Sequence, residues 1–210
     1  MVAAGCGGGR TDGRPDSLRT VASSDSAIRN PHPAIRTPHS AIRDPRPVLL
    51  FLGTSLTAGL GVDQDSAYPA LIQRRIDSLG LAWQVINGGL SGETSAGALR
   101  RLEWLLNGPV RVLVIETGAN DGLRGLDVDS TRANIDAIVA RARRHDSTMT
   151  IVLTGMEAPP NLGQAFTGRF RALYRDMARR ERCPPGSVRR PARIHHDHAR
   201  LTEMVREPLG

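Results

Sequence analysis

The sequence predicts an α/β protein in which a mostly parallel β-sheet lies between two layers of helices. Three observations predict this three-layer α/β/α sandwich. Apolar runs of strand length alternate with helix-period segments between residues 48 and 178, and glycine-rich polar loops follow these runs. A length of 210 residues with 40% hydrophobic content suits one globular domain. The chain has no run of about 18 apolar residues, the length that spans a bilayer.

Four apolar runs have the length and β-branched content of buried parallel strands. They are residues 48–52, 83–87, 112–116 and 150–154. The intervening and following segments place apolar residues three or four positions apart, which is the spacing of a helix packed on a sheet. The predicted buried helix positions are Ile72, Ile76 and Leu79; Leu99, Leu102 and Leu106; Ile135, Ile138 and Val139; and Phe166, Phe170, Leu173 and Met177.

Composition divides the chain into a disordered N-terminal tail (1–46), the α/β domain (47–178) and an atypical arginine- and proline-rich C-terminal segment (179–210). Residues 27–47 repeat with a period of seven and carry proline at the fifth place, which excludes a helix and predicts an extended linker. The net charge of +7 comes from the ends, +3 and +4, while the domain is neutral. With only 3% aromatic residues, this distribution argues against a nucleic-acid partner.

All 28 basic residues are arginine, so several enzyme classes are excluded. Without lysine the chain has no Walker-A phosphate loop and no kinase-type strand lysine. It also lacks the amine that forms a Schiff base with pyridoxal phosphate or a carbonyl substrate. The two cysteines, Cys6 and Cys183, both lie outside the α/β domain and predict no disulfide framework.

Hydroxyl, glycine and asparagine groups follow three successive predicted strands. The loop 53–59 contains Ser55, the loop 87–95 contains Gly92, and the loop 117–125 contains Asn120. Folds of this class place their chemistry at the carboxyl ends of the strands. There a serine can act as a nucleophile, while a glycine amide and an asparagine side chain can bind an oxyanion. Each loop alone is ordinary turn chemistry, but their order on three strand ends predicts acyl transfer.

These loops make the chain resemble the SGNH (GDSL) hydrolases, and within them the esterase, acyl-thioesterase and lysophospholipase branch. The resemblance runs from about residue 47 to 178 and includes residues 66–71, 120–125 and 159–161. It implies the SGNH-hydrolase, flavodoxin-like fold. It also implies hydrolysis of small esters, thioesters or lysophospholipids, with no metal or cofactor.

By this resemblance, Ser55 is the nucleophile that forms an acyl-enzyme. The backbone amides of Ser55 and Gly92 and the side chain of Asn120 form the oxyanion hole, and the loop 122–126 shapes the acyl site. The first motif departs from the family name, since Thr54 stands where GDSL has aspartate. The serine is the group that the chemistry uses, so the prediction of a hydrolase remains.

The family's closing motif, Asp-x-x-His, does not occur in this sequence. In the family this histidine is the general base for the serine, and the aspartate orients it. The nearest candidate is His195, with Ala192 where the aspartate would stand, and residues 179–193 offer no apolar fifth strand. We therefore hypothesise a frameshift near Cys183 and a fold that is incomplete at the C-terminus.

Two alternatives to a working hydrolase remain open. The first is a catalytically impaired or truncated SGNH-like protein, at most a binder of acyl ligands, because the base and the fifth strand are missing. The second is a metal site in the sequence His-His-Asp-His at 195–198, where His196 and His198 share a face if the segment is extended. The simpler interpretation of this segment is a solvated tail.

The first ten residues carry no apolar region that could serve as an export signal. Their Ala-Ala-Gly-Cys sequence nevertheless resembles the end of a bacterial lipoprotein signal, with Cys6 as the lipidated residue. A true start codon upstream would predict a periplasmic or membrane-tethered lipoprotein, and otherwise the protein is cytoplasmic. We expect a monomer.

Overall fold

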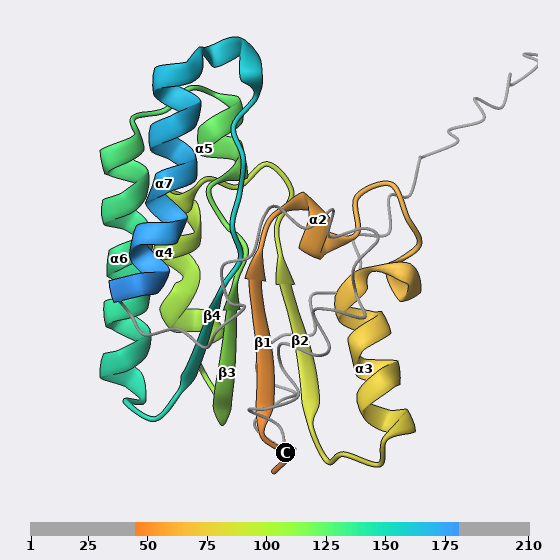
Figure 1. The fold of residues 1–210 in the computed structure, drawn as a ribbon. Coiled ribbons are helices and arrows are strands. Elements are labelled where there is room, and N and C mark those ends of the chain that lie inside the picture. Colours follow the sequence, from red (N-terminus) through yellow and green to blue (C-terminus); the bar gives the residue numbers. More distant parts are fainter. Residues whose placement is uncertain (1–44, 181–210) are drawn as a thin grey trace, which may run out of the picture. The chain divides into compact units, whose positions relative to one another are not determined.

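The structure, a computed structural model, describes residues 45–180, all within one compact unit of the chain. In this range it contains a sheet of four parallel strands in the order β2-β1-β3-β4. Helices cover both faces of the sheet (Figure 1). The predicted α/β/α class is therefore confirmed. The lipidation candidate Cys6, the frameshift candidate Cys183 and the histidines at 195–198 lie outside the described residues.

The elements alternate along the chain as the apolar pattern predicts. The strands are β1 (Val48–Gly53), β2 (Gln84–Gly89), β3 (Val110–Ile115) and β4 (Thr150–Leu153). The α-helices are α2 (Ser55–Ala58), α3 (Tyr68–Ser78), α4 (Ser95–Leu105), α5 (Ala119–Leu123), α6 (Val128–His145) and α7 (Gln164–Arg180). Two short 3₁₀ helices, η1 (Gln64–Ser66) and η2 (Pro160–Leu162), complete the described part of the chain.

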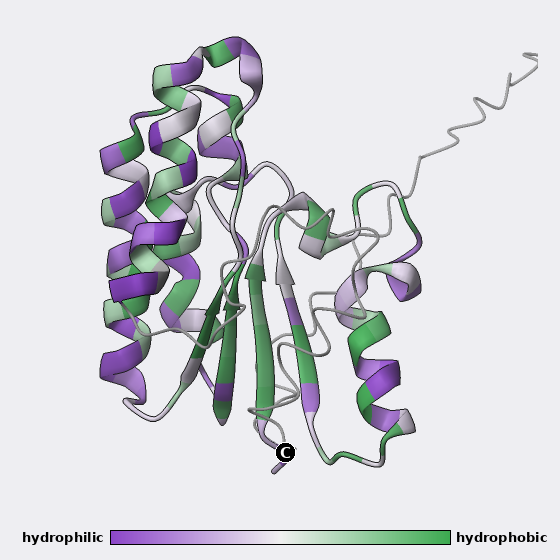
Figure 2. Ribbon diagram, in the orientation of Figure 1, coloured by the Kyte–Doolittle hydropathy of each residue, from purple (hydrophilic) through white to green (hydrophobic). Residues whose placement is uncertain are grey.

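The strand β1 lies at the centre of the sheet and is buried along its whole length. Leu50 pairs with Ile86 of β2 on one side and with Leu113 of β3 on the other. Figure 2 shows β1 as hydrophobic throughout, because both of its faces are covered by helices and none of its side chains reaches solvent. Because β1 is held by both neighbouring strands, the residues that follow it, beginning with Thr54, have a fixed position at the carboxyl edge of the sheet.

The helices divide between the two faces of the sheet. The helix α3 lies on one face, and α4, α6 and α7 lie on the other (Figure 1). On the α3 face, the ring of Phe51 contacts Tyr68 edge-on, with ring centres 5.3 Å apart. On the opposite face, the predicted positions Ile138 of α6 and Phe170 of α7 are fully buried. Among residues 45–180, no helix is both long and apolar enough to cross a membrane.

Several details differ from the sequence prediction: Leu99 and Phe166 are only partly buried, and two further differences have a clear physical reason. Leu79 is 41% exposed rather than buried, because α3 ends at Ser78 and Leu79 is already its C-cap. The third strand begins at Val110, two residues before the predicted start at 112, although Arg111 interrupts the apolar run. Arg111 is exposed and its guanidinium lies 2.9 Å from the carboxylate of Asp146, so its charge never enters the core.

The outer side of β2 is covered by a side chain of α3. The carboxamide of Gln73 accepts a hydrogen bond from the backbone N–H of Val85 at 2.6 Å. Its amide nitrogen donates to the backbone carbonyl of Trp83 at 3.1 Å. One side-chain amide thus binds a backbone group of β2 and one of the residue just before it, in the way that a neighbouring strand would.

Candidate active site

Ser55 lies in the turn between β1 and α2, at the carboxyl edge of the sheet. β1 ends at Gly53, Thr54 is the N-cap of α2, and Ser55 is the first residue of the helix. Two 2.9 Å hydrogen bonds close the turn, from the Ala58 amide to the Thr54 carbonyl and from the Leu60 amide to the Ser55 carbonyl. Ser55 is partly exposed. Its position agrees with the predicted place of a nucleophile on a strand-to-helix turn.

A buried carboxylate lies directly beneath this turn. Glu116 follows β3, is 0% exposed, and its own amide donates to the Leu52 carbonyl at 2.8 Å. The Glu116 carboxylate accepts hydrogen bonds from the amide of Thr54 at 2.8 Å, the hydroxyl of Thr54 at 2.9 Å and the hydroxyl of Thr57 at 2.7 Å. Burial raises the pKa of Glu116, and these hydrogen bonds oppose the rise.

Gly53 is the residue that lets the turn approach Glu116 so closely. A Cβ atom at position 53 would lie 1.8 Å from the Thr57 hydroxyl oxygen and 2.9 Å from a Glu116 carboxylate oxygen. Any larger residue would therefore displace the first turn of α2. The φ of Gly53 does not lie in the left-handed region, so backbone conformation does not require a glycine here. The close packing against Thr57 and Glu116 does require it.

The loop after β2 carries Gly92 and is tied to the end of β1. Gly92 is exposed and has a φ of 79°, a conformation that glycine adopts without strain. The next residue, Glu93, forms a salt bridge with Arg101 of α4, with a closest N–O distance of 2.6 Å. Arg101 also donates to the Gly53 carbonyl at 3.3 Å, and the Leu90 amide donates to the same carbonyl at 3.0 Å.

Asn120 lies in α5, beyond the end of β3, and contacts the Gly92 loop. Its side-chain nitrogen donates to the Glu93 carbonyl at 2.9 Å. A carboxamide nitrogen has two N–H groups, so one N–H orients the side chain and the other remains for an oxyanion. Asn120 is partly buried, as a group at the floor of an open site would be.

A second buried carboxylate, Asp121, anchors the Asn120 turn to the start of α4. Asp121 is 2% exposed and accepts hydrogen bonds from the amide of Ser95 at 2.8 Å and from the Ser95 hydroxyl at 2.5 Å. The Thr131 hydroxyl of α6 donates to it at 3.3 Å. Asp121 therefore fixes the orientation of α5 against α4 and α6.

The three predicted site residues thus lie on loops that are joined by direct contacts. Hydrogen bonds connect the Ser55 turn to the Gly92 loop through the Gly53 carbonyl, and the Gly92 loop to Asn120 through the Glu93 carbonyl. Acyl transfer needs a hydroxyl and amide donors that are held on connected segments, and these contacts connect the segments that carry the three residues. Sequence reasoning did not identify Glu116 or Asp121, although each directly adjoins a strand-end motif.

Within the described residues, the only histidine is His145. It is the last residue of α6, which leads into the start of β4, so it lies at the opposite end of the sheet from Ser55. His195, the nearest candidate for the general base, lies outside the described residues. The same range holds no cluster of three or more histidine, cysteine, aspartate or glutamate residues that could bind a metal ion.

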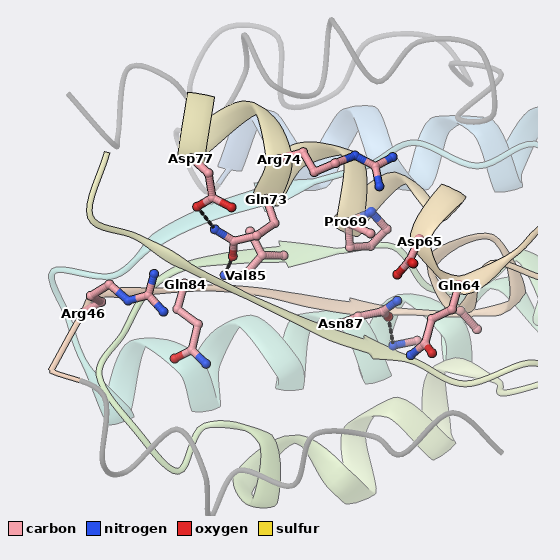
Figure 3. A pocket seen from close by; sticks show the side chains of 13 residues that line it. Arg46, Gln64, Asp65, Pro69, Gln73, Arg74, Asp77, Gln84, Val85 and Asn87 are labelled. Atoms are coloured by element: carbon pink, nitrogen blue, oxygen red, sulfur yellow. Dashed lines mark hydrogen bonds between the residues drawn. The ribbon is translucent and has the colours of Figure 1, made fainter. Parts of the chain in front are cut away.

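A cavity of about 710 Å³ lies between α3 and the outer side of β2 (Figure 3). Its lining is a mixture of polar and apolar groups, and the polar side chains include Gln64, Arg74, Asp77 and Asn87. Ser55 does not contribute to this lining. The cavity therefore lies mainly at the flank of the sheet, and it reaches the serine turn only at Ala58, the last residue of α2.

A parallel α/β sheet whose carboxyl edge carries a serine turn, a glycine loop and an asparagine is the arrangement that the sequence predicted for a serine-dependent acyl-transfer enzyme. Residues 51–203 match the sequence profile of the GDSL-like Lipase/Acylhydrolase family, and the chain belongs to this family. The resemblance stated from the loop motifs is therefore confirmed. The match continues past Ala178 and covers the histidines at 195–198.

Known relatives carry esterase and thioesterase names. The chain is 36% identical over 135 residues to the protein named Esterase TesA from Pseudomonas aeruginosa, which covers 64% of this chain and 66% of that protein. It is 33% identical over 132 residues to Thioesterase 1/protease 1/lysophospholipase L1 from Escherichia coli K12, covering 62% and 61%. The chain thus matches less than two thirds of the length of these curated relatives.

Solved structures show the same fold. The structure of AlinE4, titled an SGNH-hydrolase family esterase, superposes with a TM-score of 0.61 at 35% identity, covering 66% of this chain and 73% of AlinE4. This similarity confirms the SGNH-hydrolase fold that the resemblance implied.

Proposed function

We propose that this protein is a serine ester hydrolase that forms an acyl-enzyme on Ser55. The observation that carries the proposal is the serine turn at the carboxyl edge of β1, hydrogen-bonded to the loop that holds Gly92 and through it to Asn120. The esterase and thioesterase names of the relatives favour this function over the alternative of an impaired acyl-ligand binder.

The proposed reaction has two steps. The Ser55 hydroxyl attacks the ester carbonyl, and the amides of Ser55 and Gly92 and the Asn120 side chain stabilise the oxyanion. The alcohol or thiol leaves after protonation, and water then attacks the acyl-enzyme to release the acid and free Ser55. The chemistry of this reaction uses no metal or cofactor.

A histidine must accept the Ser55 proton in this reaction. The candidates in the chain are His195, His196 and His198, and the family match that continues to residue 203 supports their assignment to the domain. We expect that replacing one of these three by glutamine, and not the others, lowers hydrolysis by about 10³-fold or more. His145→Gln is the matched control, since His145 lies at the other end of the sheet.

Substrates with small or medium acyl chains fit the exposed apolar side chains near the site. Leu123 and Leu126 of the loop 122–126 are 64% and 41% exposed. Leu90, whose amide donates to the Gly53 carbonyl, is also exposed. Leucines that reach solvent on the segments that carry Asn120 and Gly92 would offer contacts for an alkyl chain. We propose esters, thioesters and lysophospholipids as the substrate class.

The test is hydrolysis of p-nitrophenyl acetate by the 210-residue protein and its Ser55→Ala variant. We expect Ser55→Ala to lower the rate by about 10³-fold or more. Ser78→Ala, which removes an exposed hydroxyl at the end of α3, should retain the wild-type rate. Equal activity of the wild type and Ser55→Ala would contradict the nucleophile, and an inactive wild type would favour the acyl-ligand binder.

We also propose Cys6 as a site of lipid attachment in a tethered, exported form of the protein. The Ala-Ala-Gly-Cys sequence supports this proposal. Expression from upstream codons should shift the protein to the detergent phase in Triton X-114 partitioning, and Cys6→Ser should return it to the aqueous phase. An unchanged partition between the two proteins would contradict lipid attachment at Cys6.

A further inference from the structure

The carboxylate of Glu116 is the most strongly bound group near Ser55 that the proposed reaction does not use. It contacts the turn on both sides of the serine, at Thr54 and at Thr57. Glu116 is 0% exposed and cannot contact a substrate in this structure. Its contacts are therefore with the scaffold that holds Ser55.

All the hydrogen bonds to Glu116 run in one direction. The Thr54 amide, the Thr54 hydroxyl and the Thr57 hydroxyl each donate, and an ionised carboxylate can accept all three. The Thr57 oxygen also lies 2.6 Å from the Tyr68 hydroxyl. Because the Thr57 proton is used on Glu116, Tyr68 donates to Thr57, and α3 is linked to the same network.

The Thr54 hydroxyl is a hydrogen-bond donor facing the Glu116 carboxylate, which is an acceptor. Thr54 stands where the GDSL name of the family has aspartate. An aspartate here would bring a second carboxylate to the position from which Thr54 donates at 2.9 Å, and two close carboxylates cannot both ionise freely. In this chain the residue before the nucleophile is a donor, which lets Glu116 accept hydrogen bonds as an anion.

We propose that Glu116 is a positioning residue, whose carboxylate fixes the first turn of α2 and thereby the amide and hydroxyl of Ser55. The proposal rests on the proposed function, since it gives Glu116 a role in serving that serine. An apolar residue at position 116 would leave the buried Thr54 amide and the Thr54 hydroxyl without this acceptor, and the Thr57 hydroxyl would keep only Tyr68 as a partner. The turn would then have to shift to recover these hydrogen bonds.

The test uses hydrogen exchange of the folded protein, which reports on the turn whether or not the protein is active. We expect Glu116→Ala to speed exchange in peptides that cover residues 54–60 by about tenfold or more, while α6 peptides exchange as in the wild type. Glu116→Gln should restore most of the protection, because its carboxamide keeps an acceptor oxygen. Ile138→Ala, a core truncation in α6, should loosen α6 without a selective effect on the turn.

A second readout is the rate at which a fluorophosphonate labels the serine. Glu116→Ala should lower this rate by about tenfold or more, with rescue by Glu116→Gln. If Glu116→Ala does not fold, Thr57→Val replaces it, since valine removes the hydrogen bonds of Thr57 to Glu116 and to Tyr68 with little change in shape. Thr57→Val should change hydrogen exchange and the labelling rate in the same direction as Glu116→Ala, but by a smaller factor.

The outcomes separate the two proposals. Unchanged exchange of residues 54–60 in Glu116→Ala, or in Thr57→Val where that variant stands in for it, would overturn the positioning role. Equal loosening by Ile138→Ala would overturn it as well. Glu116→Ala could speed exchange only in residues 54–60 while Glu116→Gln fails to restore the rate of labelling. That result would overturn the role of the acceptor oxygen. A wild type that is never labelled counts against the proposed function, while the exchange measurement still decides the role of Glu116.

Discussion

At the scale of single residues, the environment of Ser55 depends on partners that lie far away in the sequence. Glu116 is 62 positions from Thr54 and 59 from Thr57, and only the pairing of β1 with β3 brings them together. The apolar pattern places Glu116 at the end of a strand and says nothing of its side chain. The serine and its glycine-rich loop could be predicted because the motif is local, whereas the carboxylate beneath it could not.

Burial of Glu116 makes the stability of the protein depend on pH. Desolvation raises its pKa in the folded state, so the folded protein binds more protons than the unfolded chain between the two pKa values. Stability therefore falls as pH rises through this window. The facing groups Tyr68 and Tyr174 have pKa values raised well above the ordinary tyrosine value by burial, and they stay neutral there.

We expect the free energy of unfolding of the wild type, relative to Glu116→Gln, to fall as pH rises from the ordinary carboxyl range. The slope should reach at most about 1.4 kcal/mol per pH unit, the value for one proton. Urea denaturation of both proteins at several pH values measures it. Parallel pH profiles for the two proteins would contradict a raised pKa at Glu116.

The exposed leucine at position 123 provides a test of the acyl site. Leu123→Ala should raise KM for a p-nitrophenyl octanoate substrate by about tenfold and change KM for the acetate ester little, because a short acyl group does not reach the removed side chain. Leu79→Ala, at another exposed leucine just after α3, is the control. Equal effects on both esters would show that Leu123 does not contact the acyl chain.

At the scale of elements, polar side chains join the helices to the sheet and to one another. Glu116 joins α2 to the end of β3, Gln73 joins α3 to β2, and Asp121 joins α5 to α4. The predicted positions Ile135, Ile138 and Val139 of α6 are all buried, since a continuous helix keeps its apolar residues on one face. The prediction was wrong at Leu79 because the helix ended one residue earlier. Helix ends depend on capping contacts, which apolar spacing does not encode.

Removal of Asp121 should loosen the junction of α4, α5 and α6. Asp121→Ala leaves the Ser95 amide and hydroxyl without their acceptor, while the Thr131 hydroxyl keeps the Asp127 carbonyl, and we expect a loss of about 3 kcal/mol in the free energy of unfolding. Asp121→Asn should cost less, because its carboxamide keeps one acceptor oxygen. Urea denaturation measures both, and a loss below about 1 kcal/mol for alanine would contradict an anchoring role.

Gln73 should protect the outer edge of β2. Gln73→Leu removes the side-chain partner of the Val85 amide and leaves the Trp83 carbonyl with Arg46 alone, and we expect a loss of about 1–2 kcal/mol in the free energy of unfolding together with greater aggregation on heating. Gln64→Leu, on the neighbouring 3₁₀ helix η1, is the matched control. Thermal scans with light scattering distinguish the two variants, and identical behaviour would contradict the role of Gln73 as an edge cover.

At the scale of the whole molecule, the order of the elements could be predicted because parallel strands buried on both faces produce apolar runs that stand out from the helices. The lengths of the strands could not be predicted as well, as the start of β3 shows. A charged residue such as Arg111 can belong to a strand where the sheet meets solvent, and it interrupts the apolar run there. The loops that carry Ser55, Gly92 and Asn120 were predicted to meet because parallel strands all end at the same edge of the sheet. The general base has no local pattern of this kind in the chain.

The most direct test of the central claim is the site of covalent labelling in the wild-type protein. After reaction with a fluorophosphonate, digestion and tandem mass spectrometry should place a single adduct on the hydroxyl of Ser55, and Ser55→Ala should carry none. An adduct on another residue, or a wild-type protein that remains unlabelled, would contradict the assignment of Ser55 as the nucleophile.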